Sequence, residues 1–168
     1  MQLNKAFDPK LLDIKLKWWG VKRKTIKVPD GWVALPKSDL FIDCRVVPEK
    51  GIRGYTGDSP EFQAGVLAKA PQTIKRILET ILEGLALAGD RRSGEDPYSK
   101  PFEICLFCAW GIHRSVSTTY LIAERLKKLG YKVTLPDQKT SGQGRCTFAS
   151  SKPLAHKLPM PFGVLNPK

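Results

Sequence analysis

The chain has 168 residues, of which 42% are hydrophobic, and a formal net charge of +12, which together predict one globular domain with an ordinary core. No apolar stretch approaches the roughly 20 residues of a membrane-spanning helix, and basic residues interrupt the N-terminal region where a secretory signal would need its apolar segment: Lys15, Lys17, Lys22, Arg23, Lys24 and Lys27. The four cysteines are too unevenly placed to suggest a disulfide framework, so we expect a protein of the reducing cytoplasm.

The first half of the chain predicts a leader, two strands and a long loop. Residues 1–38 read as a basic leader, within which Trp32–Leu35 is compatible with a short strand. The segment Asp39–Val47 is mostly apolar and β-branched, which favours a strand. Residues 48–60 contain two prolines and three glycines and predict a long loop, a kind of segment that often carries function.

The second half predicts two helices that alternate with strands. Apolar residues recur at helical spacing over Thr73–Ala88, and Ser115–Leu129 has a second helical pattern. Glu103–Phe107 is typical of a buried strand, and Tyr131–Leu135 of another. This order predicts an α/β fold with a mainly parallel sheet and flanking helices, in which ligands bind at the carboxyl ends of the strands. We expect the α/β domain to span residues 39–138, between the leader and a basic tail, rich in Pro and Gly, over 139–168.

The segment between the strand Glu103–Phe107 and the helix Ser115–Leu129 has the layout of a phosphate-binding loop. Cys108 is followed after five residues by Arg114 and Ser115, and the loop opens onto the start of a helix. Unpaired amides and the helix dipole favour an anion there, the guanidinium of Arg114 matches phosphate oxygens two at a time, and Gly111 permits a tight turn. We name residues 108–115 the cradle and expect a phosphate group to bind in it.

The positive charge suggests a polyanionic partner. Basic residues concentrate toward the two ends of the chain, and in the cytoplasm the commonest polyanion is nucleic acid. A basic surface can also serve solubility alone. The candidate RNA-binding residues are Lys22, Arg23, Lys24, Arg125, Lys127, Lys128 and Lys132.

Several separated motifs resemble one known family. The strings are Asp39-Leu40-Phe41-Ile42-Asp43-Cys44-Arg45, Arg53 with Thr56-Gly57, Gly111-Ile112-His113-Arg114-Ser115-Val116, Ala123-Glu124-Arg125-Leu126 and Gly130-Tyr131-Lys132-Val133. In order and spacing they are similar to the C-terminal domain of the RNase adapter protein family RapZ, over roughly residues 39–137. The nucleotide-binding P-loop domain of that family has no counterpart in the chain, so ATP binding does not carry over.

The resemblance implies recognition of small regulatory RNA and of an amino-sugar phosphate, glucosamine-6-phosphate, by a protein that tends to form homo-oligomers. It also implies a pocket for a phosphorylated small molecule, a sugar phosphate or nucleotide, lined by Asp43, Arg45, Arg53, Thr56, Cys108, Ala109, Trp110, Gly111, Ile112, His113, Arg114 and Ser115. Two features depart from the family: an Asn-Pro-His stretch is absent after Arg45, and Ala109-Trp110 stand where Thr-Gly is usual. Asp43 could instead form a plain ion pair with Arg45, or orient Arg114.

The cradle is also similar to the phosphate loop of protein tyrosine phosphatases. In that alternative Cys108 attacks phosphorus as a thiolate, Arg114 holds the oxygens and Asp58 is the best candidate for the general acid. A third alternative is a module that sequesters a metabolite without RNA. We expect no cofactor and no metal, because Cys105 and Cys108 lack a second pair of ligands at a spacing suited to zinc.

Overall fold

A five-stranded sheet with the strand order β5-β1-β4-β3-β7 forms the centre of the molecule. The computed structural model describes residues 6–20, 32–35, 37–49, 52, 56–109, 111–136, 154–157 and 163–165. The strands of this sheet are β1 (Asp13–Gly20), β3 (Leu40–Asp43), β4 (Phe102–Cys108), β5 (Lys132–Thr134) and β7 (Gly163–Leu165). Four of them are parallel, and β7 runs antiparallel to β3. The expected α/β fold with a mainly parallel sheet is therefore confirmed.

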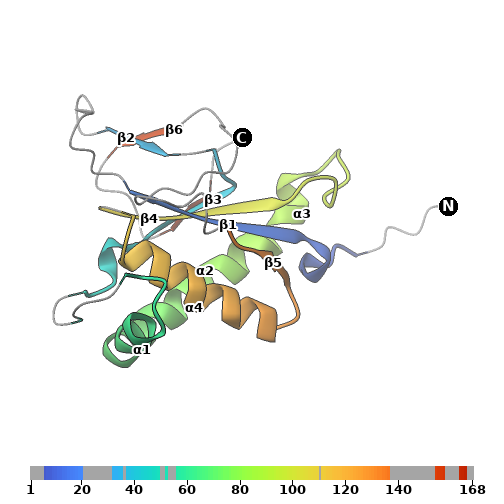
Figure 1. Cartoon of the computed structure of the whole chain (residues 1–168). Helices are drawn as coiled ribbons and strands as arrows, with labels where there is room; N and C mark the ends of the chain where they lie inside the picture. Colours follow the sequence, from blue (N-terminus) through green and yellow to red (C-terminus); the bar gives the residue numbers. More distant parts are fainter. Residues whose placement is uncertain are drawn as a thin grey trace.

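Helices cover one face of this sheet, as Figure 1 shows. They are α1 (Pro60–Lys69), α2 (Pro71–Ala86) and α4 (Arg114–Lys128), while the short α3 (Ala88–Arg91) continues from the end of α2. A second, two-stranded antiparallel sheet of β2 (Trp32–Leu35) and β6 (Leu154–Lys157) lies on the other side of the large sheet. No helix in the described part of the chain is long and apolar enough to cross a membrane.

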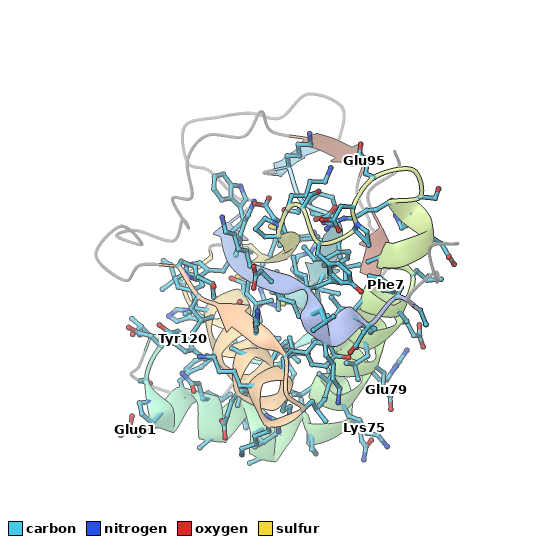
Figure 2. The ribbon with its side chains drawn as sticks, turned by 90° about the vertical axis from the view of Figure 1, so that its right-hand side faces the viewer. Phe7, Glu61, Lys75, Glu79, Glu95 and Tyr120 are labelled. Carbon is cyan, nitrogen blue, oxygen red and sulfur yellow. The ribbon has the colours of Figure 1, made fainter. Side chains whose placement is uncertain are left out.

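The core lies between the sheet and its helices. Alternate residues of the strands, such as Leu16, Ile42 and Leu106, are fully buried there against Ile77 of α2 and Ile122 of α4. In Figure 2 the charged side chains of Glu61, Lys75 and Glu79 extend from the outer side of α1 and α2, away from the sheet. This division of apolar and charged faces holds α2 and α4 in place, and thereby fixes where α4 begins.

One expectation that the structure corrects concerns the leader over residues 1–38. The described part of this segment contains β1, which lies between β4 and β5 and pairs with both. Its Lys17 is only 3% exposed, and Nζ donates hydrogen bonds to the carboxylate of Glu103 at 2.5 Å and to the carbonyl of Lys37 at 3.0 Å. Since these partners compensate the buried charge, a lysine-rich segment is able to occupy the middle of the sheet.

Three smaller differences concern a strand end, the loop and the tail. The strand predicted over Asp39–Val47 ends at Asp43, because the carboxylate of Asp43 accepts the backbone N–H of Arg45 at 2.9 Å and starts a 3-10 helix, η3 (Cys44–Val46). The loop predicted up to residue 60 is followed at once by α1, which the sequence analysis did not predict. Within the predicted tail, the structure describes the two short strands β6 and β7.

Candidate functional site

The cradle lies at the carboxyl end of β4, where three parallel strands finish side by side. Phe107 pairs with Asp43 of β3, and Cys108 pairs with Gly20 of β1. The chain then turns through Gly111, whose φ of 70° is easy for glycine and strained for other residues, and enters α4 at Arg114. The predicted arrangement of strand, loop and helix is thus present at the edge where parallel sheets bind ligands.

The thiol of Cys108 is at the centre of this turn. The side chain is 3% exposed, and its Sγ accepts the backbone N–H of Gly111 at 3.1 Å. The hydroxyl of Ser115 lies 3.2 Å from the same sulfur. Donors of this kind stabilise a thiolate more than a thiol, and they can equally contact the oxygens of a bound anion.

The first turn of α4 has no side-chain cap. His113 occupies the N-cap position without a side-chain hydrogen bond to the helix, although its carbonyl accepts the N–H of Ser117 at 2.8 Å. The imidazole of His113 instead stacks on the ring of Phe62 from α1, with 5.5 Å between ring centroids. The helix therefore presents uncapped backbone amides toward the cradle, an arrangement that favours an anion.

Arg114 is held in place by the loop that follows β3. Its Nη1 donates to the carbonyl of Arg45 at 3.0 Å, and its Nε lies 3.0 Å from a carboxylate oxygen of Glu49. The second contact is an ion pair without the alignment of a hydrogen bond, so the buried Nε has no hydrogen-bond acceptor among the described residues. Nothing in the sequence pattern pointed to Glu49, because its approach depends on the path of the loop after η3.

Asp43 and Arg45 form a tight pair beside the cradle. Both carboxylate oxygens of Asp43 accept from the guanidinium of Arg45, at distances between 2.5 and 3.0 Å. The hydrogen bond from Asp43 raises the pKa of the Arg45 guanidinium, which also lies 5.6 Å from the centre of the Phe107 ring. Asp43 thus acts on Arg114 through Arg45, whose carbonyl it helps to fix.

The segment Thr56–Ser59 closes over the first turn of α4. The N–H of Gly57 donates to the carbonyl of Ile112 at 3.0 Å, and a Cβ at Gly57 would lie 2.2 Å from the carbonyl oxygen of His113. The next residue, Asp58, is exposed and accepts a hydrogen bond from the hydroxyl of Thr56. Because only glycine fits against the cradle here, this close contact places Asp58 at its rim.

The described candidates for RNA binding lie at the other end of α4. Lys128 pairs with Glu124 at 2.7 Å and lowers the pKa of that carboxylate, chiefly through their hydrogen bond, and Lys132 lies 3.9 Å from Asp13. Arg125 donates to the carbonyl of Leu121 at 3.2 Å. Lys127 belongs to the same last turn of the helix. These residues are therefore separated from the cradle by the length of α4.

The structure brings most of the predicted ligand-binding residues to one place, namely Asp43, Arg45, Thr56, Cys108, Ala109, Gly111, Ile112, His113, Arg114 and Ser115. Arg53 and Trp110 lie outside the described residues, as do Lys22, Arg23 and Lys24. Within the described ranges, no group of three or more His, Cys, Asp or Glu side chains is arranged to hold a metal ion.

Comparisons with known proteins leave the family open. No protein-family model matches the chain, and no curated protein matches it significantly. The case for a function therefore rests on the residues of the site and on the resemblance described above.

Proposed function

We propose that this chain is a regulatory binding protein that recognises a phosphorylated small molecule in the cradle and RNA on its basic surface. The observation that carries the first part is the guanidinium of Arg114, which the carbonyl of Arg45 fixes beside the uncapped start of α4. Its Nε lies 3.0 Å from a carboxylate oxygen of Glu49 without the alignment of a hydrogen bond, so a bound phosphate would share or displace this ion-pair partner.

Two further features support the same proposal. The backbone turn at Gly111 and the uncapped start of α4 supply amide donors on the side of the cradle opposite the strand. The resemblance to the RapZ C-terminal domain favours a sugar phosphate or a nucleotide as the ligand, together with a small RNA. We place this function in the cytoplasm, as the sequence predicts. The net charge of +12 supports an RNA partner.

A cysteine-dependent phosphatase is the second candidate, favoured by the contacts of Cys108. Its sulfur receives the Gly111 N–H and lies beside the Ser115 hydroxyl, which can stabilise the thiolate as nucleophile and later as leaving group. Asp58 at the rim is the candidate proton donor in this scheme. Recognition without turnover requires neither the nucleophile nor the proton donor.

The test begins with calorimetric titration of the purified protein with inorganic phosphate and with glucosamine-6-phosphate. We expect binding that Arg114→Ala weakens roughly 10–100-fold and that Lys75→Ala, a matched change of an exposed cation on α2, leaves within about twofold. If both variants bind as tightly as the wild type, the cradle is not the binding site.

Turnover of an aryl phosphate separates the two candidates. Release of phosphate by the wild type that disappears in Cys108→Ser identifies a phosphatase, whereas binding without turnover in either protein supports recognition. Titration with a structured RNA at several salt concentrations then distinguishes a dual binder from a module that sequesters a metabolite alone, since RNA binding through many cations is steeply salt-dependent.

A further inference from the structure

A second buried thiol, Cys44, lies next to the cradle cysteine and has no role in the site described above. The parallel register of β3 and β4 ends at the pair Asp43 and Phe107. The residue after Asp43 is Cys44, which opens η3, and the residue after Phe107 is Cys108, the last residue of β4. Neighbouring strands lie about 4.7–4.9 Å apart, and a disulfide spans Cα atoms about 4.4–6.8 Å apart, so two residues that each directly follow the last strand pair are candidates for a bridge.

The two thiols also lie in the same part of the core. Cys44 and Cys108 both belong to the buried cluster that contains Ile42 and Leu106, beneath the helices. Both are free thiols, since neither takes part in a disulfide. Burial raises the pKa of the Cys44 thiol, and the negative charge of a Cys108 thiolate raises it further, as expected for close neighbours.

We propose that Cys44 and Cys108 form a reversible disulfide that switches the cradle off under oxidation by a hydroperoxide. The proposal rests on the proposed function, because it assigns regulation to the same site. Its chemistry suits the two environments: the Gly111 N–H and the Ser115 hydroxyl contact the Cys108 sulfur, while burial raises the pKa of the Cys44 thiol.

The reaction has two steps. With hydrogen peroxide, the Cys108 thiolate attacks one peroxide oxygen, the O–O bond breaks, and Cys108 becomes a sulfenic acid. The departing hydroxide takes up the proton that the Cys108 thiol had released to solvent, which gives one water. The Cys44 sulfur then attacks the sulfenic sulfur, the S–S bond forms, and the hydroxyl group leaves with the Cys44 proton as a second water. The two thiols are oxidised by two electrons, the peroxide is reduced, and a dithiol reverses the change by exchange.

The disulfide would disable binding because it moves the sulfur at the centre of the cradle. To reach Cys44, the Cys108 Sγ must leave the N–H of Gly111 and the hydroxyl of Ser115. The turn at Gly111 then loses the contact that ties it to the end of β4. The backbone amides of the cradle would therefore no longer converge on the position of a bound phosphate. Binding of phosphate is therefore coupled to the redox state of a residue pair beneath it.

The experiment treats the full chain with hydrogen peroxide, maps its peptides by mass spectrometry, and titrates it with inorganic phosphate before and after dithiothreitol. We expect a Cys44–Cys108 cross-linked peptide, a loss of phosphate affinity of about tenfold or more, and full recovery on reduction. Cys44→Ala and the milder Cys44→Ser should instead carry Cys108 to sulfinic acid, with no recovery. The matched control is Cys105→Ala, which changes another buried cysteine of β4 and should behave as wild type.

Absence of the cross-linked peptide, or equal recovery of wild type and the Cys44 variants, would overturn the proposal. Failure of the proposed function reads differently: the reduced wild type would not bind phosphate, while the peptide map would still report whether the thiols pair. The two results are therefore independent.

Discussion

The two ends of α4 present positive charge in opposite ways. At the N-terminal end, Arg114 is largely buried, its side chain 19% exposed, and is fixed by the carbonyl of Arg45. At the C-terminal end, Lys128 is 73% exposed and pairs with Glu124, one turn away on the same helix. A helix of 15 residues separates the two by about 20 Å. The first arrangement suits recognition of one group in one position, and the second suits attraction of any polyanion.

The helix itself contributes differently to the two ends. Its dipole favours an anion at the cradle, and it favours cations such as Lys127 and Lys128 in the last turn whether or not RNA binds there. Positive charge at the N-terminal end opposes the dipole and is offset there by the carboxylate of Glu49, 3.0 Å from the Nε of Arg114, whereas charge at the C-terminal end stabilises the helix by itself. The experiments below test this contrast.

The largest expected effect is that of Arg114→Ala on phosphate binding. Loss of charge-assisted hydrogen bonds costs about 1.5–3 kcal/mol, so we expect the dissociation constant for inorganic phosphate to rise roughly 10–100-fold in calorimetric titration. Lys128→Ala, the matched change at the other end of α4, should alter it by less than about twofold. Equal effects of the two variants would remove the distinction between the ends.

Gly57→Ala tests how tightly the loop closes on the cradle end. The added Cβ would lie 2.2 Å from the carbonyl oxygen of His113 and 2.8 Å from the N of Ser117, both backbone atoms that cannot move aside. We expect a loss of stability of about 1–3 kcal/mol in urea unfolding, accompanied by weaker phosphate binding. Gly130→Ala serves as comparison, since its Cβ would meet nothing within 4 Å and only its φ of 91° is strained. Unchanged phosphate binding in a folded Gly57→Ala protein would show that the loop is not part of the site.

The pH dependence of stability should differ between a group buried at the cradle and one exposed beyond it. Burial raises the pKa of Cys44 above its ordinary value of 9.0, so the folded state retains a proton that the unfolded state releases. Stability from this group is complete below about pH 9 and falls as the pH rises toward about 10. Urea unfolding at both pH values should show this loss in the wild type and a smaller one in Cys44→Ala. Glu124, which is fully exposed, has its pKa lowered by Lys128, and Glu124→Gln should leave the alkaline profile unchanged. Parallel profiles of wild type and Cys44→Ala would contradict the prediction.

The smallest effect is expected from a single cation at the far end. Lys127→Ala should weaken the binding of a structured RNA about two- to threefold and reduce the slope of log affinity against log salt by about 0.7–0.9, the value for one phosphate contact. Phosphate binding in the cradle should not change. A salt slope identical to that of the wild type would mean that Lys127 serves the helix and not RNA.

How far sequence predicts this molecule depends on how local each determinant is. The cradle was predictable because Cys108, Gly111 and Arg114 act within one loop, and α2 because its isoleucines recur at helical spacing. β1 was not, since its lysines suggest a solvated segment until Lys17 meets Glu103, 86 residues away. Likewise α1 buries only Phe62 and Val66, too few for a clear pattern. The contact of Glu49 with Arg114 depends on the loop path, which no periodicity encodes.

The placement of β1 has a consequence for synthesis. β1 and β3 are both translated before β4, yet β4 occupies the position between them in the sheet. At about 5–20 residues per second, roughly 4–18 s pass between the emergence of β1 and of its partner β4. During that interval the backbone edge of β1 that will pair with β4 has no partner strand. The apolar side chains of Ile14, Leu16 and Trp18, which are buried in the folded protein, also lack their native neighbours on β4. The nascent chain is thus expected to acquire its binding site only after the cradle strand has inserted between β1 and β3.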